Sequence, residues 1–219
     1  MSLENDSVRS LPRINEPAPD FEAKSTHGVL HLSDYKGKWV MLFSHPADFT
    51  PVCSTEFMAF ARRIKDFEAL NVQPIGVSID SVFSHIAWAR SMEEMGGVTI
   101  PFPIIADLDM KVAQAYGMIH PATSDTAPIR AVFFIDPKQV IRAILYYPQS
   151  TGRNIDEILR VFEALQVTDA NGVSTPADWK KGGSVVLPPP QTTADAAKRV
   201  ADNSVQVKSW YLAEKELTK

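Results

Sequence analysis

The chain has 219 residues, of which 45% are hydrophobic and 22% are charged, and these proportions are ordinary for a globular protein. Its formal net charge of −4 gives no electrostatic support to nucleic-acid binding, and no window reaches the roughly 18 apolar residues that a membrane span requires. Its 1 cysteine and the lack of a signal-peptide pattern in its first residues fit a reducing, cytoplasmic location. We therefore expect neither a nucleic-acid nor a membrane partner.

From about residue 20 to residue 166, strand-like and helix-like patterns alternate, which is typical of an α/β domain. The apolar run 40–43 predicts a buried strand, and apolar residues at helical spacing from Phe57 to Leu70 predict an amphipathic helix after it. The other expected elements, in chain order, are strands at 29–32 and 73–79, a helix from Ser81 to Gly97, a strand at 103–106, a helix near 110–116, strands at 131–135 and 140–147, and a helix at 154–166.

Beyond Thr168 the pattern changes, because glycine and proline pairs interrupt any regular periodicity. This tail nevertheless carries Trp179, Trp210 and Tyr211, and it is too apolar for a disordered linker. We therefore expect two parts: a main domain over residues 1–167, and an extension over residues 168–219 that packs on the core or on a partner subunit.

The single cysteine, Cys53, follows a proline-bounded turn and opens the predicted helix that contains Phe57. The first turn of a helix has unpaired N–H groups and the positive end of the helix dipole, and both favour the nucleophilic thiolate. A lone cysteine is more often a small apolar filler, so its neighbours must decide between packing and reactivity.

Several residues could complete a reactive site around this sulfur. Thr50 can point its hydroxyl towards Cys53, and Pro46 can close one side of a pocket without adding a competing N–H group. Arg130 and Arg153 are candidate donors to an oxygen that develops negative charge, because arginine stays protonated and holds its N–H groups in fixed geometry. The pattern suits attack on a peroxide bond.

The segment from Phe43 to Cys53 resembles the active-site segment of peroxiredoxins and matches their P-x-x-x-T-x-x-C signature in full. The blocks at 101–107 and 145–154 agree with the same family, and the resemblance covers about residues 12–212. It is similar to the long 1-Cys branch with a C-terminal extension. The resemblance implies a thioredoxin-like α/β fold with a central mixed sheet flanked by helices, plus a smaller C-terminal extension domain.

The resemblance also implies residue roles. Cys53 matches the peroxidatic cysteine, and Arg130 and Arg153 match the two active-site arginines of the family. The remaining positions that match are Thr50 and Pro46 of the signature, His45 beside the pocket, and Glu56, which helps to orient an arginine.

The implied partners are a peroxide substrate and an external thiol reductant, which could be thioredoxin, glutaredoxin or a low-molecular-weight thiol. The family further implies a homodimer paired through the strand at 140–147, and leaves open whether dimers assemble into a decameric ring. No cofactor and no metal is implied. His27, His31, His85 and His120 show no metal-ligand spacing, and we expect surface or satisfied core positions for them.

The expected mechanism is attack of the Cys53 thiolate on hydrogen peroxide or an organic hydroperoxide, which converts the cysteine to a sulfenic acid. With no second cysteine, an external thiol must reduce it. A thiol–disulfide oxidoreductase is disfavoured because Glu56 stands where its C-x-x-C motif needs a cysteine, and a Cys53–His45 hydrolase pair lacks a recognisable third member. A ring-forming holdase or a redox sensor with little turnover stays open.

Overall fold

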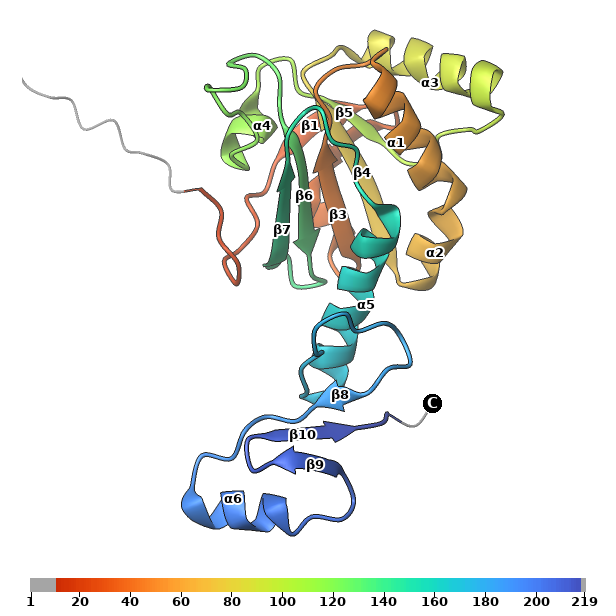
Figure 1. Ribbon diagram of the computed structural model, residues 1–219. Coiled ribbons are helices and arrows are strands. Elements are labelled where there is room, and N and C mark those ends of the chain that lie inside the picture. The colour runs from red at the N-terminus through yellow and green to blue at the C-terminus, as the bar shows by residue number, and fades with distance from the viewer. Residues whose placement is uncertain (1–10, 218–219) are drawn as a thin grey trace, which may run out of the picture. The chain divides into compact units, whose positions relative to one another are not determined.

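The computed structural model describes residues 11–217, and its contacts divide the chain into two compact units, residues 1–155 and 156–219 (Figure 1). The elements of the first unit are β1 (Glu22–Ser25), β2 (Gly28–His31), the 3₁₀ helix η1 (Leu32–Tyr35), β3 (Trp39–Ser44), α1 (Pro51–Arg62), α2 (Ile64–Ala69), β4 (Val72–Ser78), α3 (Val82–Gly96), β5 (Ile104–Ala106), α4 (Lys111–Ala115), β6 (Arg130–Ile135) and β7 (Ile141–Tyr147). Among residues 11–217, no helix combines the length and apolar character needed to cross a lipid bilayer.

The first unit is built on a seven-stranded mixed sheet with the strand order β2-β1-β5-β4-β3-β6-β7. The strands β3, β4 and β5 run parallel, whereas β6 and β7 are antiparallel to their neighbours. The sheet and its flanking helices confirm the expected mixed α/β architecture (Figure 1). The central strand β3 leads from its carboxyl end into α1, so the loop and first turn that contain the cysteine lie at that edge of the sheet.

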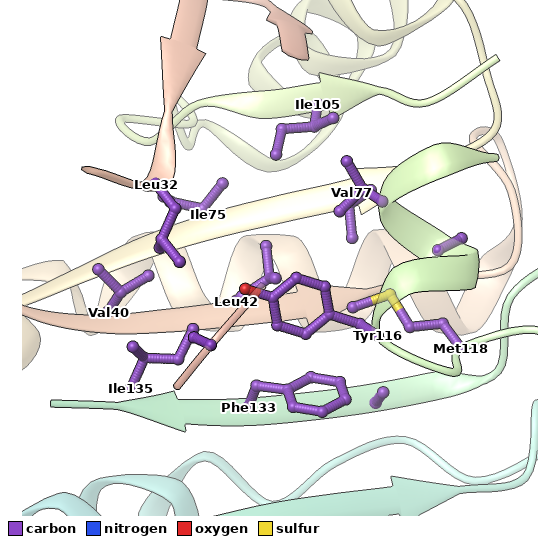
Figure 2. Packing of buried hydrophobic residues seen from close by; sticks show 14 of the residues in the cluster. Leu32, Val40, Leu42, Ile75, Val77, Ile105, Tyr116, Met118, Phe133 and Ile135 are labelled. Atoms are coloured by element: carbon purple, nitrogen blue, oxygen red, sulfur yellow. The ribbon is translucent and has the colours of Figure 1, made fainter. Parts of the chain in front are cut away.

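One face of the sheet carries the apolar cluster drawn in Figure 2. Side chains alternate along a strand, so Val40 and Leu42 of β3 point to this face. Their neighbours in the cluster come from β4, β6 and the segment after α4: Ile75, Val77, Phe133, Ile135, Tyr116 and Met118. All of these side chains are at most 2% exposed, so they anchor the three central strands.

The opposite face of β3 holds α1 against the sheet. The ring of Phe43 packs on the rings of Phe57 and Phe60 of α1, with centroids 5.2 and 4.7 Å away. Gly76 of β4 permits this approach, since a Cβ atom there would lie 3.0 Å from the ring of Phe57. The helix that carries Cys53 is thereby fixed on the sheet by aromatic contacts.

The predicted helix after residue 81 is confirmed at both ends. The Ser81 hydroxyl accepts the N–H of Ser84, and Gly97 ends the helix with a left-handed φ of 61°.

The prediction of one helix through Leu70 is wrong, because the chain leaves helical geometry at Arg63 (φ −102°, ψ 12°) and restarts as α2. The strand β1 was not predicted, because it has only four residues and contains no apolar run.

The second unit contains α5 (Ile155–Asn171), which begins at the boundary, β8 (Val185–Val186), α6 (Thr193–Val200), β9 (Gln206–Ser209) and β10 (Leu212–Lys215). Its three strands form a small sheet in the order β8-β10-β9. Trp179 is buried and its Nε1–H donates to the carbonyl of Gly183 at 3.0 Å. Trp210 and Tyr211 lie in the turn between β9 and β10 and are about half exposed, at 49% and 56%.

Candidate active site

Cys53 occupies the third position of α1, as the sequence predicted for the first turn of a helix. Thr50 is the N-cap residue, with extended backbone geometry, and Pro51 fills the first helical position, where a missing N–H group costs nothing. The turn before it contains Phe49 at a φ of 54°, which is sparsely populated for an aromatic residue. The cysteine side chain is fully buried.

Arg130 supplies the charge beside the sulfur. It is the first residue of β6 and is only 2% exposed. Its Nη1 lies 3.4 Å from Sγ of Cys53 and 2.7 Å from Oε2 of Glu56, while its Nε–H donates to the carbonyl of Gln149 at 2.9 Å. The sulfur is therefore not enclosed by apolar side chains alone, because a guanidinium N–H group points at it.

Glu56 joins the two arginines. It lies three residues after Cys53 on the buried face of α1, and its carboxylate accepts N–H groups from the backbone, Nε and Nη2 of Arg153 at 2.7–2.8 Å. Burial alone would raise the pKa of Glu56, but the charges and hydrogen bonds of Arg153, together with the charge of Arg130, lower it. We refer to Glu56, Arg130 and Arg153 as the arginine cluster.

Arg153 makes its hydrogen bonds to Glu56 and to backbone carbonyls. Its Nη1 donates to the carbonyls of Ser44 and Ala131 at 2.9 and 3.0 Å, and its guanidinium lies over the rings of Phe43 and Phe60. Among the described residues, all of its hydrogen bonds go to Glu56 and to these two carbonyls. Arg153 therefore fixes Glu56, and Glu56 in turn fixes Arg130.

The two signature residues before Cys53 lie in the half-buried turn that follows β3. The Thr50 hydroxyl donates to the carbonyl of Ala47 at 2.9 Å, so its proton is used within the turn and its oxygen is left as an acceptor. Pro46 lies at the start of the same turn and has no N–H group to place there. Ser54 ties the turn to the helix by donating to the Thr50 carbonyl and accepting the indole N–H of Trp88.

A second buried polar group lies at the same end of β3, and we call it the histidine cluster. It consists of His45, Asp48 and His85, whose side chains are at most 1% exposed. Nε2 of His45 lies 2.9 Å from Oδ1 of Asp48, and Nδ1 of His85 lies 2.8 Å from Oδ2. Burial alone would raise the pKa of Asp48, but the hydrogen bonds of the two histidines outweigh it and lower the pKa to about 2.

The hydrogen-bond partners define how protons are shared in this cluster. His85 lies between two acceptors, the carboxylate of Asp48 at 2.8 Å from its Nδ1 and the carbonyl of Ile105 at 3.1 Å from its Nε2. His45 gives its Nε2 proton to Asp48, and its buried Nδ1 has no hydrogen-bond partner among the described residues. Burial lowers the pKa of His45, although Asp48 opposes this, so the ring is neutral.

The histidine cluster has the residue types of a metal site, since its ligand atoms lie within 4.8 Å of one another. The short contacts, however, pair a proton donor with an acceptor at 2.8 and 2.9 Å, and the side chains are closed to solvent. We interpret the cluster as a hydrogen-bonded network around the Asp48 carboxylate rather than as a metal site.

Comparison with known proteins agrees with this geometry. The sequence profile of the AhpC/TSA family matches residues 14–144, and that of the C-terminal domain of 1-Cys peroxiredoxin matches residues 164–203. A peroxiredoxin of Aquifex aeolicus is 52% identical over 96% of this chain and 99% of its own length. Peroxiredoxin 2 of Caldanaerobacter subterraneus is 51% identical over 99% of this chain and 98% of its own.

The chain belongs to the peroxiredoxin family. It is a thiol peroxidase, and its structural relatives are of the same kind. The yeast mitochondrial 1-Cys peroxiredoxin superposes with a TM-score of 0.84 at 40% identity, over 94% of this chain and 100% of that one. A peroxiredoxin 6 variant of Arenicola marina gives a TM-score of 0.83 at 36% identity, over 94% and 99% of the two chains. Both support the thioredoxin-like fold and the C-terminal extension that the sequence led us to expect.

In this peroxiredoxin, the structure brings together four of the residues singled out from the sequence: Cys53, Glu56, Arg130 and Arg153. His45 lies in the neighbouring histidine cluster, and its hydrogen bond goes to Asp48. Sequence reasoning gave no role to Asp48 or His85, because no spacing rule joins residues 37 positions apart. We expected a surface or a satisfied core position for His85, and the structure gives it the core position.

Proposed function

We propose that Cys53 is the peroxidatic residue and that it reduces hydrogen peroxide and organic hydroperoxides. The thiolate sulfur attacks the terminal, hydrogen-bearing oxygen of ROOH, the O–O bond breaks, and the departing RO⁻ takes a proton to leave as water or an alcohol. The sulfur becomes a sulfenic acid. The observation that carries this proposal is the 3.4 Å approach of Arg130 Nη1 to the sulfur.

Arg130 is the proposed catalytic donor. A cation beside the sulfur favours the thiolate, and the same N–H groups can stabilise the oxygen that gains charge as the bond breaks. Glu56 and Arg153 hold this guanidinium in place. Thr50, Pro46, His45 and Arg153 are proposed to complete the peroxide-binding pocket, with the Thr50 oxygen and the unpartnered Nδ1 of His45 as acceptors for a peroxide proton.

Access to the site requires movement. Cys53 is fully buried, so a peroxide reaches the sulfur only when neighbouring side chains shift, and we propose that those of the turn before α1 do so. The half-buried Pro46 and Thr50 and the exposed Phe49 make up this turn. Limited access also keeps water away, which strengthens the interaction of a guanidinium with a developing charge.

The proposed reductant is an external thiol, because the chain has 1 cysteine and cannot form an internal disulfide. The thiol forms a mixed disulfide with the sulfenic sulfur and releases water, and a second thiol then restores the cysteine. The yeast mitochondrial relative is described as resolved through glutathione and thioredoxin systems. Thioredoxin, glutaredoxin and low-molecular-weight thiols are accordingly the candidates here.

A homodimer is proposed through β7, which lies at the edge of the sheet. Edge strands present unpaired backbone groups that another strand can cover. The first residue of β7, Ile141, is already bonded to Asn15 and Glu16, so pairing would use the strand beyond it. We further propose that the dimers assemble into a decameric ring. The remaining parts of this proposal are a division into domains at residues 1–167 and 168–219 and a cytoplasmic location.

The direct test compares wild type and Cys53→Ser in steady-state consumption of hydrogen peroxide and an organic hydroperoxide, with dithiothreitol, thioredoxin and glutaredoxin as reductants. We expect turnover by wild type and none by the variant. Intact-mass spectrometry under rising peroxide should show addition of one oxygen atom and then of two, since no second cysteine traps the sulfenic acid. A sulfur that reacts once and never turns over with any reductant would favour a redox sensor, and a cysteine that stays unmodified would exclude both functions.

A further inference from the structure

Ser44 is the last residue of β3 and is fully buried. Its hydroxyl donates to the carbonyl of Ile129 at 2.6 Å and accepts the N–H of Ala131 at 3.0 Å. These two backbone groups stand on either side of Arg130, the residue whose guanidinium reaches the Cys53 sulfur. The Ser44 hydroxyl thus binds the backbone on both sides of the proposed catalytic arginine.

The sheet itself does not supply this connection. The antiparallel ladder between β3 and β6 ends at the pair Phe43 and Val132, one residue before Ser44. On its other side, Ser44 still pairs with Val77 of β4, so β3 continues while the first residues of β6 pair with β7 but no longer with β3. Where the backbone ladder between β3 and β6 ends, the Ser44 hydroxyl makes the next hydrogen bonds between them. It connects the start of β6 to the strand that leads to the cysteine.

Ser44 also holds the second arginine. Its carbonyl accepts Nη1 of Arg153 at 2.9 Å, and the carbonyl of Ala131 accepts the same nitrogen at 3.0 Å. Ser44 therefore contacts both arginines, the backbone on either side of Arg130 and the guanidinium of Arg153. A buried hydrogen bond to a fixed backbone group is the kind of support that keeps a reacting constellation within a fraction of an ångström.

We propose that Ser44 is a positioning residue for the peroxide reaction. Its hydroxyl keeps Arg130 within reach of the Cys53 sulfur, and its carbonyl keeps Arg153 on Glu56. This inference rests on the proposed function of Cys53, and it assigns Ser44 an action through the arginines. The competing interpretation is an ordinary structural hydrogen bond that stabilises the sheet without affecting the sulfur.

Ser25 offers a matched control for that interpretation. It is also buried, at 5% exposure, and its hydroxyl also donates to a carbonyl, that of Gly28, at 2.7 Å and accepts a backbone N–H, that of His27, at 3.1 Å. It lies in the hairpin of β1 and β2, which contributes no residue to the arginine cluster. Both serines therefore make the same type of bridge, and they differ in what the bridge supports.

The experiment uses Ser44→Ala and Ser25→Ala in the full chain. We expect both variants to lower the melting temperature. Only Ser44→Ala should lower the second-order rate constant for oxidation of Cys53 by hydrogen peroxide, by roughly 10-fold or more, because a small displacement of a reacting group is costly. The rate at which dithiothreitol reduces the oxidised cysteine should be similar in all three proteins. The pH profile of iodoacetamide alkylation of Cys53 should move to higher pH in Ser44→Ala alone.

If the alanine variant does not fold, Ser44→Thr and Ser44→Val extend the test. The two side chains have nearly the same shape, but threonine has a hydroxyl group where valine has a methyl group. Threonine should retain faster oxidation than valine. Equal oxidation and alkylation in Ser44→Ala and wild type, an equal fall in Ser25→Ala, or equal rates in the threonine and valine variants would each overturn the proposal. If wild type fails to turn over peroxide, the proposed function fails, while the alkylation comparison still decides the role of Ser44.

Discussion

Two buried charge clusters lie at the carboxyl end of β3, and they use similar parts differently. In the arginine cluster, one carboxylate, Glu56, is held by Arg130 and Arg153. In the histidine cluster, one carboxylate, Asp48, is held by His45 and His85. Both carboxylates have pKa values lowered by their partners against the effect of burial.

The difference lies in the number of donors. An arginine has five N–H groups, so Arg130 can bind Glu56 and the Gln149 carbonyl and still direct an N–H at the Cys53 sulfur. A histidine has at most two, and His85 spends both on Asp48 and a backbone carbonyl. The arginine cluster can therefore take part in chemistry, whereas the histidine cluster mainly holds the turn before α1, with Nδ1 of His45 as its one unpartnered atom among the described residues.

The largest expected effect comes from breaking the histidine cluster. Asp48→Asn keeps the shape of the side chain but removes the charge that faces His45 and His85. Breaking a buried charge network at one partner costs about 3–5 kcal/mol, so we expect the free energy of unfolding from urea titration to fall by that order. The surface variant Asp109→Asn is the control, and it should change stability far less. Equal losses in the two variants would contradict a structural role for the cluster.

The next largest effect is on the chemistry of the arginine cluster. Arg130→Gln removes the charge and the N–H group that point at the sulfur, and loss of one such donor lowers a rate about 100-fold. We expect that decrease in the rate constant of Cys53 with hydrogen peroxide, measured by stopped-flow mixing. Arg63→Gln, which alters an ion pair at the surface with Asp66, should react like wild type. An Arg130 variant as fast as that control would exclude a catalytic role for the guanidinium.

Acid titration should expose the charge of Asp48. Its pKa is about 2 in the folded protein, against 3.8 for a free side chain. Because the folded value is the lower one, the stabilisation is complete above about pH 4 and is lost as the pH falls through about 2; it amounts to about 2 kcal/mol. The difference in unfolding free energy between wild type and Asp48→Asn should therefore shrink as the pH falls over this range. A difference that does not vary with pH would contradict the assignment.

The smallest expected effect on stability comes from an exposed histidine that lies beside two carboxylates. His31 lies between Glu22 and Asp34 at 3.2 and 3.3 Å, and the hydrogen bond to Glu22 is the main reason that its pKa is raised. A raised pKa gives stabilisation that is complete below about pH 6.5 and is lost as the pH rises through the folded value. The stability difference between wild type and His31→Gln should be slight, should vanish at high pH and should shrink in high salt. Insensitivity to both would show that the ion pairs contribute nothing.

Local signals were strong enough to predict much of this site from the sequence. The strand before the turn, the helix that starts before Cys53 and the helix from Ser81 to Gly97 were all predicted, since apolar periodicity, prolines and caps act over a few residues. The resemblance gave family roles to Arg130 and Arg153, which their chemistry had made candidates, and added Glu56. It did not say that Arg153 binds Glu56 and two carbonyls while Arg130 reaches the sulfur, because that division depends on where β6 starts relative to α1.

By itself, then, the sequence determined the family and the α/β architecture, and it singled out the cysteine that we propose to react, since a signature and its periodicity are properties of neighbouring positions. Tertiary structure alone decided the pairing of Asp48 with His85 across 37 positions and the bridge from Ser44 to the flanks of Arg130 across 85 and 87. The physical reason is that a buried polar atom takes whichever partner the packed strands bring within hydrogen-bond distance, and no local pattern in the chain records that partner.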